Sequence, residues 1–168
     1  MDNDFSSMDV QEALATAIKS EIEAEGIYKK LKSMVANFVI KDKLNFLISE
    51  EKKHQQIVRK LYAKLFSDDK PALPDKSLAP RLTLALKGEE TVPDLLEIAL
   101  EAEKRSEEFY DALSQEVEDR GTQEILQYLV SMEHGHYSLL KGEYELCQRD
   151  EQYFQRGDFQ YDMVHIGP

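Results

Sequence analysis

Apolar residues recur at intervals of three and four positions along four long stretches of this chain. That spacing places the apolar side chains on one face of an α-helix and leaves polar residues on the opposite face. The pattern predicts helices over about residues 8–35, 40–66, 92–119 and 122–148, with Gly121 ending the third helix. Only seven glycines and five prolines occur in the chain, so long stretches lack helix breakers. We therefore expect an all-α fold.

The lengths of the connections predict how these helices are arranged. Short links join the first helix to the second and the third to the fourth, so each pair should form an antiparallel hairpin. A proline-containing crossover over residues 67–91, with a short helix near residues 82–86, joins the two hairpins. We expect residues 1–168 to form one domain, a four-helix bundle, with residues 149–168 as a C-terminal tail packed on it.

Charge and cysteine content exclude several classes of function. The net charge of −12 disfavours binding to nucleic acid, which needs a basic face, and to an anionic membrane surface. Cys147 is the single cysteine, which excludes an intramolecular disulfide and a four-thiolate metal site. No apolar run approaches about 18 residues, and the N-terminal residues do not resemble a signal peptide. The expected location is the cytoplasm.

Four glutamates and two histidines interrupt the apolar faces of the four predicted helices. They are Glu21 in the first helix, Glu51 and His54 in the second, Glu103 in the third, and Glu133 and His136 in the fourth. An unpaired carboxylate buried in a helix bundle costs several kcal/mol or takes up a proton. We therefore expect these residues to share one binding site.

An internal repeat supports this expectation. A shift of 82 residues superimposes Glu21 on Glu103, Tyr28 on Tyr110, Glu51 on Glu133 and His54 on His136 without a gap. A repeat of this kind predicts two similar hairpins related by a pseudo-twofold axis, and such an axis would bring the six residues together.

The six side chains have the chemistry of a two-metal site. Four carboxylates balance the charge of two divalent cations, and each neutral imidazole supplies one nitrogen ligand. Glutamate and histidine at positions i and i+3 of a helix can reach the same ion. Oxygen and nitrogen ligands without thiolate suit iron or manganese, and zinc is also compatible.

The chain resembles the rubrerythrin and ferritin-like superfamily over roughly residues 8–147. The resemblance lies in the motifs SEIEAEGIY, EEKKH, EAEKRSEEFY and MEHGH, which agree in order, spacing and helix face. It implies a ferritin-like fold and a centre of two iron ions that reacts with hydrogen peroxide or oxygen. It also implies that Tyr28 and Tyr110 are hydrogen-bond partners of the metal ligands.

The sequence departs from relatives of this kind at three points. Rubrerythrins usually carry a rubredoxin domain with two C-x-x-C pairs, which is absent here, so we expect a separate electron-donor protein. Rubrerythrins often have a further glutamate one turn after the third-helix ligand, where this chain has Ser106. Bacterioferritins bind haem through a methionine after the second-helix glutamate, where this chain has Lys52, so we expect no haem.

Three classes of function remain open. The first is an oxidoreductase that uses peroxide or oxygen, the second is a ferroxidase for iron storage or transfer, and the third is a metal-binding bundle without turnover. We expect a homodimer or higher homo-oligomer. Other acidic and histidine residues are expected outside the site, most of them in solvent: Glu23, Glu25, Glu101, Glu107, His134 and His165.

Overall fold

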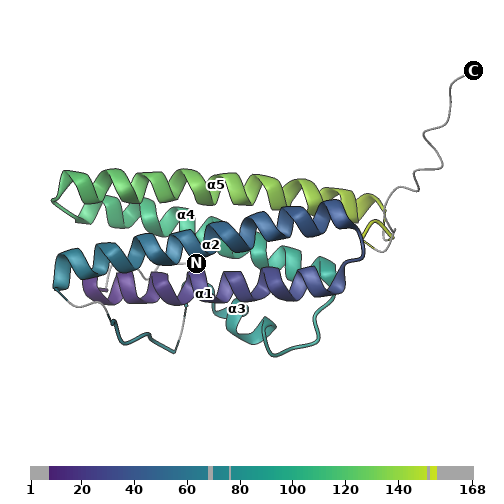
Figure 1. The fold of residues 1–168 in the computed structure, drawn as a ribbon, viewed down its shortest axis with the longest axis horizontal. Coiled ribbons are helices and arrows are strands. Elements are labelled where there is room, and N and C mark those ends of the chain that lie inside the picture. Colours follow the sequence, from purple (N-terminus) through teal and green to yellow (C-terminus); the bar gives the residue numbers. More distant parts are fainter. Residues whose placement is uncertain (1–7, 68–69, 76, 151, 155–168) are drawn as a thin grey trace, which may run out of the picture.

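The computed structural model describes residues 8–67, 70–75, 77–150 and 152–154. Within these ranges it has five α-helices and no strand. They are α1 (Val10–Met34), α2 (Phe38–Phe66), α3 (Pro80–Ala85), α4 (Val92–Glu116) and α5 (Arg120–Arg149) (Figure 1). The helical bundle predicted from the apolar periodicity is confirmed.

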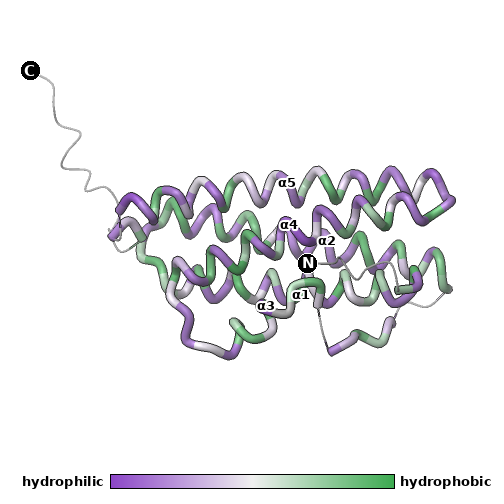
Figure 2. The backbone as a smooth tube through the Cα atoms, turned by 180° about the vertical axis from the view of Figure 1, so that it is seen from behind, coloured by the Kyte–Doolittle hydropathy of each residue, from purple (hydrophilic) through white to green (hydrophobic). Residues whose placement is uncertain are grey.

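Two hairpins build the bundle. α1 packs along α2 and α4 packs along α5, and the hairpins meet mainly through α1 and α4. The short helix α3 and the crossover lie on the outside, against α1 and α4 (Figure 1). Apolar and polar stretches alternate along each long helix, as expected for helices with one buried face (Figure 2).

The link between α4 and α5 differs from the prediction. The side chain of Asp119 accepts a hydrogen bond of 2.8 Å from the backbone amide of Thr122 and caps α5. α5 therefore begins at Arg120, and Gly121 lies in its first turn. The prediction that Gly121 ends the preceding helix is wrong, because α4 already ends at Glu116 and an aspartate supplies the next cap.

Two apolar clusters fill the bundle, one towards each end. One cluster includes Leu31, Leu44, Leu47, Leu96 and Leu140, and the other includes Leu14, Ile18, Val58, Leu61 and Leu126. The layer between them holds the polar residues that the sequence singled out. The two clusters thus hold the helices together on either side of that layer.

α1 is enclosed by α2, by α4 and by α3 of the crossover, and this corrects two expectations about exposure. Glu23, expected in solvent, is 3% exposed because Thr83 of α3 donates a hydrogen bond of 2.8 Å to its carboxylate. Glu25 is also buried, and Gln55 of α2 donates a hydrogen bond of 2.8 Å to it. Both carboxylates thus bind a side chain of a neighbouring helix instead of facing solvent.

Two further acidic residues are half-buried. Glu101 forms ion pairs with Arg81 and Arg105, and Glu107 lies 3.2 Å from His134. Both carboxylates lie at the surface, as expected, but these contacts partly shield them from solvent.

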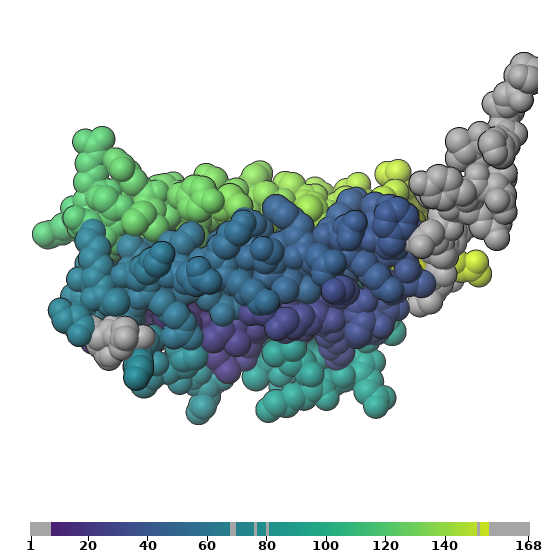
Figure 3. Space-filling model, in the orientation of Figure 1, coloured from purple at the N-terminus to yellow at the C-terminus, as the bar shows by residue number. Residues whose placement is uncertain are grey.

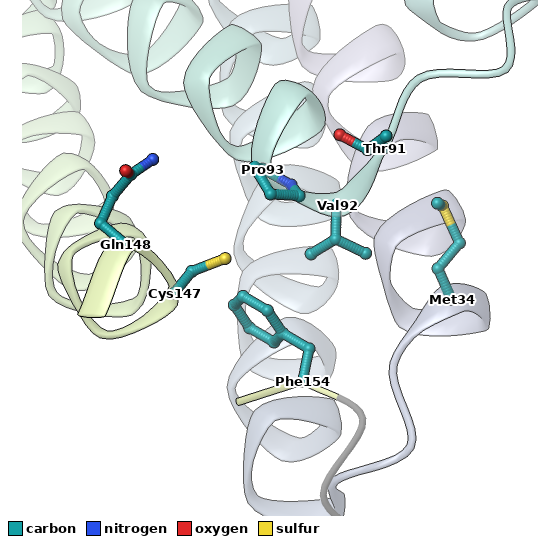
Figure 4. Close-up of a pocket in the computed structure, with 7 residues that line it drawn as sticks. All are labelled: Met34, Thr91, Val92, Pro93, Cys147, Gln148 and Phe154. Atoms are coloured by element: carbon teal, nitrogen blue, oxygen red, sulfur yellow. The ribbon is translucent and has the colours of Figure 1, made fainter. Parts of the chain in front are cut away.

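After α5 the chain turns back onto the bundle. Phe154 is buried, and its carbonyl oxygen accepts a hydrogen bond of 3.0 Å from the amide of Ala36. A pocket of about 590 Å³ lies beside this contact, where the side chains of Cys147, Val92 and Phe154 face a shared space (Figure 4). The rest of the predicted tail, residues 155–168, lies outside the described residues.

No helix among the described residues is long and apolar enough to cross a membrane.

Candidate metal centre

The six predicted site residues lie together in the polar layer at the middle of the bundle. α1 supplies Glu21, α2 supplies Glu51 and His54, α4 supplies Glu103, and α5 supplies Glu133 and His136. Each of these side chains is at most 2% exposed to solvent. The four long helices thus each contribute at least one carboxylate to a site closed from water.

The first imidazole faces carboxylates from three helices. The Nδ1 atom of His54 lies 2.8 Å from Glu133 Oε1, 3.5 Å from Glu21 Oε2 and 3.6 Å from Glu51 Oε2. These distances place oxygen atoms of α1, α2 and α5 around one nitrogen.

The second imidazole repeats this arrangement with the halves of the chain exchanged. The Nδ1 atom of His136 lies 3.2 Å from Glu51 Oε1, 3.4 Å from Glu103 Oε2 and 3.8 Å from Glu133 Oε2. Corresponding distances around the two histidines differ by at most 0.4 Å (2.8 against 3.2, 3.5 against 3.4, 3.6 against 3.8). The two rings stack 5.2 Å apart at 18°. The internal repeat in the sequence is therefore a pseudo-twofold axis through this site.

Two tyrosines form hydrogen bonds across the two hairpins and orient Glu21 and Glu103, the two site glutamates that are not followed by a histidine. The Tyr28 hydroxyl on α1 donates a hydrogen bond to Glu103 Oε1, and the Tyr110 hydroxyl on α4 donates to Glu21 Oε1. The second oxygen of each glutamate faces an imidazole, because Glu21 Oε2 lies near His54 and Glu103 Oε2 lies near His136. Each tyrosine thus holds one oxygen and aims the other at the centre.

Among the described residues, eight buried side-chain atoms have no hydrogen-bond partner, and all eight belong to this site. They are both carboxylate oxygens of Glu51, both ring nitrogens of His54 and of His136, Glu103 Oε2 and Glu133 Oε1. His54 and Glu133 approach within hydrogen-bonding distance but not with hydrogen-bond geometry. Native proteins leave few buried polar groups unsatisfied, and such a cluster calls for a further partner.

The donor atoms suit metal ions as that partner. One ligand atom from each of Glu51, His54, Glu133 and His136 lies within 4.8 Å of the other three. Carboxylate oxygens and imidazole nitrogens without a thiolate are the ligands that iron, manganese and zinc share. The remaining carboxylates, Glu21 and Glu103, flank this group from the opposite side of the bundle, where the tyrosines hold them.

Burial and mutual repulsion disturb the acid–base properties of the carboxylates. Burial, together with the charges of Glu103 and Glu21, raises the pKa of Glu51 to about 8. The same causes raise the pKa of Glu133 well above its ordinary value. Burial also acts to raise the pKa of Glu21, but the neighbouring side chains of His54, Glu51 and Tyr110 outweigh it, and the pKa is lowered. Without metal, the site must therefore hold protons in place of cations.

Neighbouring groups also shift the pKa values of the histidines and tyrosines in the site. Burial opposes the charged imidazoles, but the carboxylates around them outweigh it, so the pKa of His54 is raised and that of His136 is raised to about 10. Burial and the adjacent carboxylates raise the pKa of Tyr28 and Tyr110 well above the ordinary value. Both phenols are thereby kept protonated as hydrogen-bond donors.

The remaining candidate residues lie elsewhere. His134 is exposed and sits 3.2 Å from Glu107, outside the cluster. Ser106 is buried on α4, three residues after Glu103. His165 lies outside the described residues.

Sequence reasoning did not identify two residues beside the site. The ring of Phe46 meets the imidazole of His136 edge-on at 6.3 Å, and Glu50 is a further carboxylate that is only 6% exposed. A signal for the first exists, because Phe46 corresponds to Tyr128 under the 82-residue shift.

Comparison with known proteins agrees with this geometry. A family model described as Rubrerythrin matches residues 12–144. A hypothetical protein from Pyrococcus furiosus has a similar solved structure, with 34% sequence identity, a TM-score of 0.78, and coverage of 86% of this chain and 93% of the other. No match was found among curated proteins.

The metal-free protein should lose stability as pH rises from about 5 to about 8. The folded-state pKa of Glu51, about 8, exceeds the ordinary 4.5, so in this range the folded state retains a proton that the unfolded state releases. Glu133 and both histidines also have raised pKa values and act in the same direction. Glu21, whose pKa is lowered, contributes stability above about pH 4.5 and does not change the trend. One titrating group contributes about 1.4 kcal/mol per pH unit.

Thermal unfolding of chelator-treated protein, followed by circular dichroism, measures this trend. Glu51→Gln removes one titrating carboxylate, so its melting temperature should fall less steeply with pH and exceed that of the wild type at pH 8. A wild-type melting temperature that rises steadily from pH 5 to pH 8 would contradict the expectation.

Proposed function

Because this chain belongs to the rubrerythrin family, we propose that it holds two iron ions between its four glutamates and two histidines and reduces hydrogen peroxide or oxygen. The eight unpartnered buried atoms are the observation that supports this most directly. They are oxygen and nitrogen atoms, which iron binds, and they come from five of the six predicted ligands, all except Glu21. Glu21 joins the set through its contact with His54.

A bound pair of Fe(II) ions would supply the two electrons that, with two protons taken up from water, convert one hydrogen peroxide to two waters. The chain's own residues do the rest of the work. Glu51 and Glu133 each lie near both imidazoles, whereas Glu21 and Glu103 are each held by a tyrosine, and these four carboxylates with His54 and His136 would hold the two ions. The apolar clusters on both sides exclude bulk water from this layer.

The tyrosines contribute hydrogen bonds rather than charge. The raised pKa values of Tyr28 and Tyr110 keep both phenols neutral, so each can donate to a carboxylate throughout the physiological pH range. A carboxylate held in this way keeps one oxygen directed at the centre, which is the preorganisation that a reactive site needs.

We also propose that electrons come from a separate donor protein and that the protein is a homo-oligomer. The chain has a single cysteine, Cys147, which lies in the apolar cluster near the end of α5 and not in the site. Leu84 of α3, 70% exposed, is an apolar side chain that a second copy would cover.

Anaerobic protein loaded with Fe(II) should bind two irons per chain and be oxidised rapidly by hydrogen peroxide. Metal analysis gives the stoichiometry, and the rise of ferric absorbance in the near ultraviolet gives the rate. Glu51→Ala should lose bound iron and this reaction. His134→Ala is the matched control, because His134 is exposed and outside the cluster, and it should retain both.

Iron-loaded protein that is inert to both peroxide and oxygen would rule out an oxidoreductase and leave a metal-binding bundle. Oxidation by oxygen in an assembly far larger than a dimer, with more than two irons per chain, would favour iron storage. Size-exclusion chromatography separates these outcomes.

Ser106→Glu should raise the rate of peroxide turnover. Residue 106 is buried one turn after Glu103, so a glutamate there would bring a further carboxylate to the edge of the centre. Without metal this extra buried carboxylate should lower the melting temperature at pH 8, and metal should restore it. Ser106→Ala should change neither property. An unchanged rate in a stable, metal-loaded Ser106→Glu protein would show that this position does not reach the centre.

A further inference from the structure

The helices around the metal centre do not all pack equally closely. The α1–α2 and α4–α5 hairpins pack along their length, and the α1–α4 contact is reinforced by the crossing tyrosines and covered by α3. α2 and α5 make the sparsest contact of the neighbouring pairs, although they carry four of the six site residues. We call the line where these two helices face each other, marked by Phe46, Glu50 and Tyr128, the α2–α5 seam. The two helices lie side by side on one face of the molecule (Figure 3).

Phe46 stands between solvent and the centre on this seam. Its side chain is 49% exposed, and its ring meets the buried His136 imidazole edge-on at 6.3 Å and 88°. Tyr128, its partner under the 82-residue shift, is 52% exposed. Both repeats thus place a half-exposed aromatic ring five residues before the glutamate of the Glu-x-x-His pair. A ring with one face in water can change rotamer without disturbing the core.

Glu50 lies one helical turn after Phe46 on α2. It is four residues after Phe46 and four before His54, so the three side chains follow one another along one face of α2. Its carboxylate is 6% exposed, and its ion-pair partner is Lys53, whose side chain is 60% exposed. The corresponding residue of the other repeat is Met132, so the carboxylate is not needed for the symmetry of the centre. Nothing in the proposed reaction uses it.

We propose that metal ions reach the centre along the α2–α5 seam, where Phe46 acts as a gate and Glu50 is the first carboxylate that an entering cation meets. This inference rests on the proposed metal centre. A divalent cation gives up its hydration water at high cost, and a carboxylate on the path offsets part of that cost. Lys53 can release Glu50 by swinging into solvent, and the unpartnered ligand atoms then take the ion. The net charge of −12 raises the local concentration of cations at the surface.

If metal ions enter along this path, a substitution on it should change the rates of metal binding and release more than the dissociation constant. Stopped-flow mixing of metal-free protein with Co(II), followed by the visible absorbance of the bound ion, gives the association rate, and a chelator chase gives the dissociation rate. Phe46→Ala should raise both rates by a similar factor and leave the dissociation constant nearly unchanged. Glu50→Gln should lower the association rate by about tenfold, the size of effect expected for removal of a steering charge.

Matched controls lie away from the seam. Glu23 is a carboxylate of the same kind, 3% exposed and paired with Lys19, but it lies under α3, and Glu23→Gln should bind Co(II) at the wild-type rate. Phe38 is a half-exposed phenylalanine at the start of α2, and Phe38→Ala should do the same. Phe46→Leu should fall between the wild type and Phe46→Ala, and circular dichroism verifies that each variant is folded.

Three results would overturn the inference. If the wild type binds two Co(II) ions but both seam variants match the controls, entry occurs elsewhere and the metal centre stands. If Glu50→Gln weakens equilibrium binding without slowing association, Glu50 belongs to the centre and not to a path. If the wild type binds no Co(II), the metal centre and the path fail together.

Discussion

Four carboxylates buried in one layer of a helix bundle are the constraint on which this structure depends. They cannot all be charged without compensation, because their repulsion in a site excluded from water is stronger than the apolar contacts of any one residue around them. Two divalent cations would neutralise them, and protons do so when metal is absent. The apolar clusters above and below the layer supply enough packing to keep four such helices together around it.

The symmetry of the site follows from the same constraint. Each imidazole faces three carboxylates, one on its own helix, one on the other helix of its own hairpin and one on the other hairpin. For His54 these are Glu51, Glu21 and Glu133, and for His136 they are Glu133, Glu103 and Glu51. Both hairpins therefore contribute carboxylates around both imidazoles. One departure from symmetry lies at the α2–α5 seam, where Glu50 in one repeat corresponds to Met132 in the other.

Much of this arrangement could be predicted from the sequence, because helix periodicity and the 82-residue shift are local or one-dimensional signals. They located the four long helices and the six residues that the structure brings together. What they missed depends on contacts between distant segments. Glu23 and Glu25 are polar positions on α1 that other segments cover, the crossover helix α3 in the case of Glu23 and α2 in the case of Glu25, and single-helix periodicity cannot show that cover. The positions of Phe46 and Glu50 depend on how closely α2 approaches α5, which no pattern within α2 contains.

The crossed tyrosines also bear on how such a chain arose. Tyr28 of the first hairpin supports the glutamate of the second, and Tyr110 of the second supports the glutamate of the first, so each half completes the other and neither completes itself. A single hairpin of about half this length, paired with an identical copy, would already possess every ligand and both tyrosines. Gene duplication and fusion would then have joined two working halves through residues 67–91, after which positions such as 46, 50, 128 and 132 were free to diverge.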